Sequence, residues 1–149
     1  MKLLVLNGPN LNMLGVREPD VYGRTTYADL VRRIHEVCAR EGIEVECLQS
    51  NHEGQLVDWI QQAYQKVDGI VMNPAAYTHT SVALLDALKA VAIPAVEIHI
   101  SNIYDREEFR HHSYPGMACV KTIYGHGIDG YEEAILFLKE YLTKENNTL

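Results

Sequence analysis

Two ionisable side chains interrupt an otherwise apolar stretch, Pro94 to Ile100 (PAVEIHI). Such a stretch is typical of a central strand of a parallel sheet, which is apolar almost throughout because both faces are buried. Glu97 and His99 are two residues apart, so in a strand both side chains point to the same face. A carboxylate beside an imidazole fixes its tautomer and favours its protonated form, which suits a general acid. A purely structural ion pair is the alternative.

A second set of polar groups lies in a long loop, Asn7 to Gly23 (NGPNLNMLGVREPDVYG), directly after the apolar segment Leu3 to Leu6. Glycine, proline and asparagine crowd it, which excludes a helix or a regular strand. It also exceeds the usual βα connection of about two to six residues. We therefore expect an active-site loop, with residues 17–24 closing as a lid. Its polar side chains able to bind or react are Asn10, Asn12, Arg17 and Tyr22.

Tyr22 and Arg17 could form a base. A free tyrosine has a pKa of about 10 and is almost wholly protonated near neutral pH. An arginine a few ångströms away would stabilise the phenolate and lower that pKa. A solvated arginine and a packed tyrosine explain these two residues equally well.

Arg106 and Arg110 are four residues apart, so a short helical turn over 105–110 would place both on one face. Like charges repel there, which indicates a shared anion, although a solvated face is equally common. His111 and His112 lack ligand spacing with His99 and are expected at the surface, not at a metal. No P-loop or GxGxxG sequence is present, so nucleotide binding has little support.

The elements that position these groups follow from hydrophobic periodicity. Strands and helices alternate five times, which predicts a flavodoxin-like, doubly wound, five-stranded parallel sheet of order 2-1-3-4-5 with helices on both faces. Ligands of such sheets bind beyond the carboxyl ends of the strands. We expect a single domain over 1–149, with strands near 3–6, 43–47, 69–72, 95–100 and 117–124, helices near 27–38, 53–67, 81–88 and 131–142, and a frayed tail over 143–149. Ser50 and Glu53 should form a capping box.

Composition narrows the function. Hydrophobic residues make up 47% of the chain and charged residues 22%, as in a globular protein. A net charge of −7 argues against nucleic acid or an anionic membrane surface as a partner. The three cysteines, Cys38, Cys47 and Cys119, lack metal-type spacing and are expected to be buried, reduced thiols. Cys47 and Cys119 are expected in strands. Without a signal peptide or an apolar run long enough to span a membrane, a cytoplasmic location is expected.

Several of these segments together resemble the type II 3-dehydroquinate dehydratases. The matching segments are NGPNLNMLGVREPDVYG, QSNHEG, NPAAYTHTS, EIHISN and REEFRHHS. They span most of the chain in the order and spacing of that family. The resemblance implies dehydration of the small anion 3-dehydroquinate to 3-dehydroshikimate through an enolate, with no cofactor and no metal. It also implies a homododecamer built from trimers. Departures at Ala75, Lys121 and His126 touch no proposed catalytic position.

The resemblance also assigns roles to individual residues. Tyr22 would be the base, Arg17 would activate it, and Asn12 would hold a water that stabilises the enolate. His99 would be the acid, oriented by Glu97. The substrate would be bound by Asn73, His79, Arg110 and the backbone N–H groups of Ile100 and Ser101, while Asp86 would reach a neighbouring subunit's site. On periodicity alone, Asp86 is equally a solvent-facing residue.

Two other functions compete with the lyase. A flavodoxin-like module that holds a phosphate or flavin explains the fold, but not Glu97, His99 and the arginines together. A metal-dependent hydrolase is the third possibility.

Overall fold

A computed structural model describes residues 1–16 and 24–147. Its centre is a five-stranded sheet, parallel throughout, of order β2-β1-β3-β4-β5. This confirms the predicted flavodoxin-like architecture and strand order. The strands are β1 (Lys2–Asn7), β2 (Glu44–Gln49), β3 (Gly69–Asn73), β4 (Ala95–His99) and β5 (Lys121–Tyr124).

Strand register brings polar residues to one edge of the sheet. Asn7, the last residue of β1, is in register with Asn73 of β3 and with Gln49 of β2. Farther along the sheet, His99 ends β4 and is paired with Tyr124 of β5. Because all strands run the same way, the segments that follow them emerge at the same edge.

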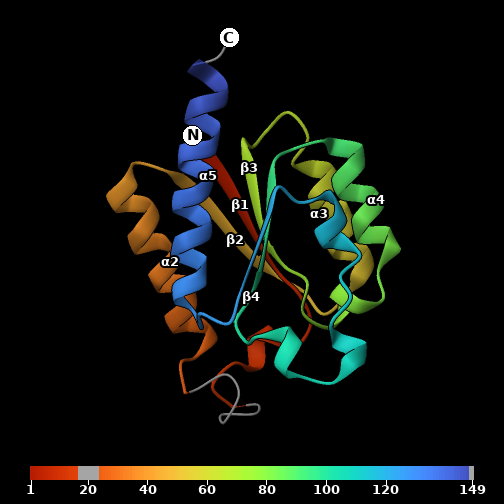
Figure 1. Cartoon of the computed structure of the whole chain (residues 1–149). Helices are drawn as coiled ribbons and strands as arrows, with labels where there is room; N and C mark the ends of the chain where they lie inside the picture. The colour runs from red at the N-terminus through yellow and green to blue at the C-terminus, as the bar shows by residue number, and fades with distance from the viewer. Residues whose placement is uncertain (17–23, 148–149) are drawn as a thin grey trace.

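The helices form one layer on each face of the sheet (Figure 1). One layer holds α2 (Tyr27–Glu41) and α5 (Asp129–Asn147), and the other holds α3 (Glu53–Gln62) and α4 (Val82–Val91). Each layer covers its own apolar cluster, and residues of β1 alternate between the two. Leu3 and Val5 face α2 and α5, whereas Leu4 and Leu6 face α3 and α4.

Local signals explain where two of these helices begin. The Thr26 side chain accepts from the Asp29 backbone and the Asp29 side chain accepts from the Thr26 backbone, both at 3.1 Å, so a capping box opens α2. Ser81 caps α4 through a 3.0 Å hydrogen bond from the Leu84 N–H. The box predicted at Ser50 is absent, because the Ser50 hydroxyl instead accepts from the backbone of His52 at 3.0 Å.

Three further boundaries differ from the predictions. Helix α3 ends at Gln62 instead of 67. Residues Pro115–Ala118 form a 3-10 turn, η5, so β5 begins only at Lys121 and Cys119 precedes it. Proline at the start of this turn has a φ already suited to a helical turn, which favours the turn over an extended strand here. Helix α5 continues to Asn147, so residues 143–147 are helical instead of frayed.

The three cysteines are free thiols, with Cys38 buried and Cys47 and Cys119 partly buried. Cys38 thus meets the expectation of a buried, reduced thiol, and the other two do so only in part. In the part of the chain that the structure covers, no helix combines the length and the apolar character needed to cross a membrane.

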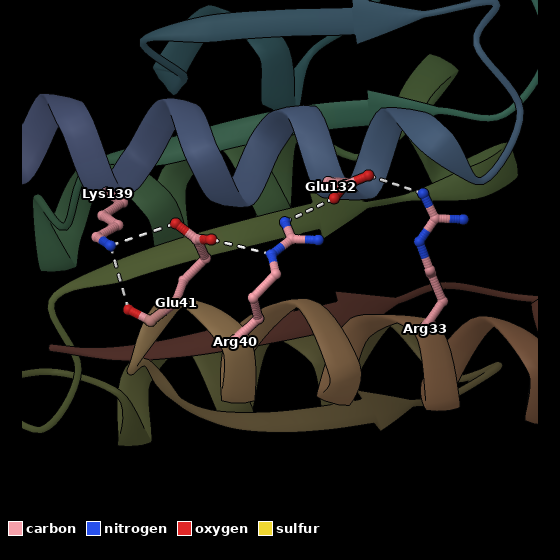
Figure 2. Close-up of polar contacts among 5 residues, drawn as sticks. All are labelled: Arg33, Arg40, Glu41, Glu132 and Lys139. Atoms are coloured by element: carbon pink, nitrogen blue, oxygen red, sulfur yellow. Dashed lines mark hydrogen bonds and ion pairs between the residues drawn. The ribbon is translucent and has the colours of Figure 1, made fainter.

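Five charged side chains form a network that joins α2 to α5 across the surface of their layer (Figure 2). Glu132 accepts from Arg33 through one carboxylate oxygen and from Arg40 through the other, each at 2.7 Å. Arg40 also pairs with Glu41 at 3.0 Å, and Lys139 lies 3.3 Å from the same carboxylate. Glu132 therefore ties two turns of α2 to the first turn of α5.

The backbone after β1 packs tightly against the backbone after β3. The Gly8 N–H donates to the Asn73 carbonyl at 2.8 Å, and a Cβ at Gly8 would lie 2.5 Å from the carbonyl oxygen of Pro74. No side chain fits in that gap, so glycine is required at position 8 for the two strand ends to meet.

Candidate active site

An open cavity of about 530 Å³, its mouth included, lies at the carboxyl ends of β1, β3 and β4. This is where a doubly wound sheet is expected to bind its ligand. Six residues predicted from the sequence line it: Asn73, His79, His99, Ile100, Ser101 and Arg110. Asn10 and Arg106, to which the family resemblance assigns no role, line it as well.

Glu97 and His99 are almost fully buried at the end of β4, with 1% and 5% of their side chains exposed. His99 Nε2 lies 3.3 Å from Glu97 Oε1, an ion-pair distance. No aligned hydrogen bond links this nitrogen to any residue that the structure describes. Because Nε2 is turned toward the carboxylate, Nδ1 is the nitrogen left to act on a ligand in the cavity.

Further contacts stabilise the charge on Glu97. Burial raises the pKa of its carboxyl, but His99, Ser113 and Thr122 together outweigh this effect and hold that pKa below its ordinary value. The Ser113 hydroxyl donates to Oε2, and the Thr122 hydroxyl donates to Oε1 at 3.2 Å. Near neutral pH the buried carboxylate is therefore ionised beside the imidazole.

The Asn73 side chain is held by Tyr131, a residue that hydrophobic periodicity predicted only as part of the apolar core. Its Nδ2 donates to the Tyr131 hydroxyl at 2.9 Å, and this hydroxyl donates to Asn7 Oδ1 at 2.7 Å. Asn73 Oδ1 accepts from the Ala75 N–H at 3.1 Å. Tyr131 is fully buried, and burial raises the pKa of its phenol well above the ordinary value. The chain of hydrogen bonds fixes the Asn73 amide, whose second Nδ2 hydrogen remains for a ligand acceptor.

His79 has a defined tautomer. Its Nδ1 lies 2.8 Å from the carbonyl oxygen of His112, and a carbonyl can only accept, so Nδ1 carries the hydrogen. Burial lowers the pKa of His79; His99 and Arg110 lower it further, against the opposing effects of the His112 carbonyl and Glu97. The neutral ring then has Nε2 as an acceptor, which fits a ligand hydroxyl.

The arginines reach the cavity from irregular structure. The predicted helical turn over 105–110 is two separate 3-10 turns, η3 (Ile103–Asp105) and η4 (Glu108–Arg110). Arg106 and Arg110 nevertheless both line the cavity. Arg110 Nε lies 2.7 Å from Glu107, so its charge is partly compensated. Two cationic groups at one rim make the cavity suitable for a small anion.

The end of β4 supplies backbone donors. The carbonyls of His99 and Ser101 accept from Gly125 at 3.3 and 3.1 Å, and that of Ile100 accepts from Gly127 at 3.0 Å. In a trans peptide the N–H points opposite to the carbonyl. The N–H groups of Ile100 and Ser101 therefore point away from the turn between β5 and α5.

Other predicted residues lie elsewhere. Asn12 does not line the cavity; its Oδ1 accepts from Gln49 at 3.4 Å, and Asn10 occupies the cavity wall instead. Asp86 is an exposed residue of α4 and does not line the cavity of its own chain. Arg17, Tyr22 and the predicted lid over 17–24 lie outside the described residues, except for residue 24.

Fold and cavity together define a doubly wound α/β protein with a buried acid–base pair and cationic groups at the switch point of its sheet. The family described as Dehydroquinase class II matches residues 1–139. This chain belongs to the class II dehydroquinase family.

Individual relatives agree with this assignment. A 3-dehydroquinate dehydratase of Variovorax paradoxus is 56% identical over 142 residues, which cover 92% of this chain and 97% of that protein. The enzyme of the same name from Clostridium acetobutylicum is 53% identical over 97% of this chain and 100% of its own. The crystal structure of a type II dehydroquinase from Butyrivibrio crossotus superposes with a TM-score of 0.92 at 54% identity, covering 93% of this chain and 97% of that one.

Proposed function

We propose that this protein is a type II 3-dehydroquinate dehydratase, a hydro-lyase that removes water from 3-dehydroquinate to give 3-dehydroshikimate through an enolate. The observation that carries the proposal is the buried Glu97–His99 pair at the wall of a cavity rimmed by Arg106 and Arg110. Elimination beside a ketone needs a base for the proton, a stabiliser for the enolate and an acid for the departing hydroxyl.

His99 is the acid of this scheme. Glu97 lies 3.3 Å from Nε2 and fixes the ring, so that Nδ1 can deliver a proton to the leaving hydroxyl. Burial excludes bulk water from the Glu97 carboxylate, which strengthens its interaction with His99 Nε2.

Tyr22 is the base and Arg17 its activator, on the grounds given by the family resemblance. The enolate oxygen needs a polar partner. Asn10 suits this role better than Asn12, because Asn10 lines the cavity and Asn12 faces Gln49.

Substrate binding uses the remaining polar groups. The carboxylate is taken by the N–H groups of Ile100 and Ser101, which point away from the neighbouring turn. Asn73 donates to a substrate oxygen, neutral His79 accepts from a hydroxyl, and Arg110 contributes charge. The reaction requires no cofactor or metal.

The assembly is a homododecamer built from trimers, in which Asp86 completes the site of a neighbouring subunit. Its exposed position on α4, beside the half-exposed Val82, supports this role. The enzyme works in the cytoplasm, in the shikimate pathway towards aromatic amino acids.

The test is direct. Purified protein is mixed with 3-dehydroquinate, and the ultraviolet absorbance of the conjugated enone product is followed. Absorbance should rise with turnover, and it should not rise with a His99→Gln variant of equal stability. A wild-type protein that is folded and produces no enone would overturn the proposed function.

A further inference from the structure

The carboxylate of Glu97 is enclosed by two hydroxyl donors that come from outside its own strand. Thr122 is its cross-strand neighbour in β5, since the two residues are paired in the register. Ser113 lies between η4 and η5 and reaches the other carboxylate oxygen. Each oxygen of the buried carboxylate thus has its own hydroxyl partner.

The direction of the Ser113 hydrogen bond is fixed. The Gly116 N–H donates to the Ser113 oxygen at 2.9 Å, so the hydroxyl already accepts from the backbone. Its single hydrogen is then directed to Glu97 Oε2. A hydroxyl oriented in this way pays little further conformational entropy when it binds the carboxylate.

The enclosure is also tight. A Cβ at Gly116 would lie 2.8 Å from Glu97 Oε1 and 2.8 Å from the Ser113 oxygen. The turn that carries Gly116 therefore packs its backbone directly against the carboxylate, and Glu97 has little room for a second rotamer.

We propose that Ser113, assisted by Thr122, is a positioning residue of this enzyme: it holds the Glu97 carboxylate charged and in the single orientation that aligns His99. The inference rests on the proposed function, because it assigns a role in the dehydration step. Ser113 does not line the cavity and its hydroxyl donates to Glu97, so we assign its effect to Glu97.

The charged and titratable groups around Glu97 come from several elements. His99 lies on the same strand as Glu97, and His79 of the 3-10 turn η2 (Ala75–His79) also interacts with Glu97 electrostatically. Cys119 approaches from the segment after η5; burial, together with Glu97, raises the pKa of this thiol to about 12, so it stays neutral. Ser113 and Thr122 are thus the neutral donors whose loss changes the carboxylate without adding or removing a charge.

The sign of the expected effect follows from the direction of the bond. A donor to a carboxylate stabilises the ionised form, so its removal raises the pKa of Glu97. If turnover requires ionised Glu97, the acid limb of the pH profile moves to higher pH. A residue with only a structural role would lower stability and leave that limb in place.

The experiment compares Ser113→Ala, Ser113→Thr and wild type, with Ser81→Ala as a matched loss of a buried serine hydroxyl elsewhere. Values of kcat and KM are measured for 3-dehydroquinate across pH. For Ser113→Ala we expect kcat about ten- to a hundredfold lower, KM within about twofold of wild type and an acid limb about one unit higher. Ser113→Thr, which keeps the hydroxyl, should recover most of kcat. Ser81→Ala should lose stability and keep the wild-type profile.

Two further measurements separate the possible failures. Thr122→Val removes the donor to the other oxygen with little change of shape and should shift the same limb in the same direction. Glutamate labelled with ¹³C at the side-chain carboxyl, assigned by Glu97→Gln, reports the Glu97 titration without turnover. If wild type lacks dehydratase activity, the proposed function is wrong. The titration of Glu97 still tests whether Ser113 holds this carboxylate ionised. If wild type is active but Ser113→Ala and Thr122→Val leave both the acid limb and the Glu97 titration unchanged, the positioning role is wrong and the proposed function stands.

Discussion

The hydroxyl of Tyr131, in α5, donates a 2.7 Å hydrogen bond to Asn7 at the end of β1. The same hydroxyl accepts from Asn73 at 2.9 Å, so one phenol on a helix joins two strand ends beneath the cavity. Because all three side chains are buried, no water replaces a lost partner at low cost.

Tyr131→Phe should therefore affect both stability and binding. It leaves Asn7 Oδ1 and Asn73 Nδ2 without a buried partner, which should cost about 1–3 kcal/mol in the free energy of unfolding. The freed Asn73 amide should raise KM more than it lowers kcat. Urea denaturation and steady-state kinetics measure the two effects, with Tyr64→Phe, at an exposed tyrosine, as the control. Equal values for both variants would contradict this role.

Tyr22→Phe should nearly abolish turnover while substrate still binds, since the proposed function makes the Tyr22 hydroxyl the base. Loss of a general base costs about 10²–10⁴ in rate. Arg17→Gln should also be slow, and its optimum should move to higher pH because the tyrosine regains its ordinary pKa. The pH–rate profile and calorimetric binding measure these effects. An unchanged profile in Arg17→Gln would exclude the activating role.

Mixed oligomers test the placement of Asp86. Asp86→Ala and Tyr22→Phe enzymes should each be weak alone, and refolding them together should create sites with an intact Tyr22 from one chain and an intact Asp86 from another. Activity is compared with that of separately refolded controls. A verified mixed oligomer that shows no gain over their average would place Asp86 outside the neighbour's site.

The pairs between α2 and α5 should contribute modestly. Glu132→Gln removes the charge that binds Arg33 and Arg40, and exposed pairs contribute about 0.2–1 kcal/mol each. We expect unfolding to become easier by about 1 kcal/mol at low salt, with a smaller difference at high salt because of screening. Glu36→Gln, at an exposed position of α2, is the control. A difference independent of salt would rule out an electrostatic origin.

Stability should depend on pH through Glu97. Its pKa is lowered in the folded protein, so the unfolded chain binds the proton more readily. The contribution is present above the unfolded pKa, near 4.5, and is lost as pH falls through the lower folded value. Denaturation across this range should show wild type more stable than Glu97→Gln at neutral pH, with the gap closing in acid. A gap that stays constant would mean that the carboxylate gains nothing from its partners.

Sequence patterns predicted the fold class, the strand order and most of the helices and strands. Strand order followed from alternation, and Glu97 and His99 stood out because they broke an apolar run. Periodicity could not separate Asn10 from Asn12, since both lie in an irregular loop where only the fold decides which faces inward. Tyr131 was predicted only as an apolar core residue. Its hydrogen-bond partners are 124 and 58 residues away in the sequence, so no local pattern indicates them. Ser113 had no periodic signal, lying between two short 3-10 turns.

The contact of Gly8 with the Pro74 carbonyl also limits redesign of the enzyme. Where β1 and β3 end, next to the cavity-lining residues Pro9 and Asn73, the two backbones are hydrogen-bonded and too close for a side chain at position 8, so their spacing is not set by exchangeable side chains. Engineering that aims at larger substrates would gain nothing from substitutions there, because even alanine at position 8 would force the two strands apart. Among the described residues, substitutions at other positions of the cavity lining, such as Ala76, Ile103 and Arg106, are better suited to altering selectivity.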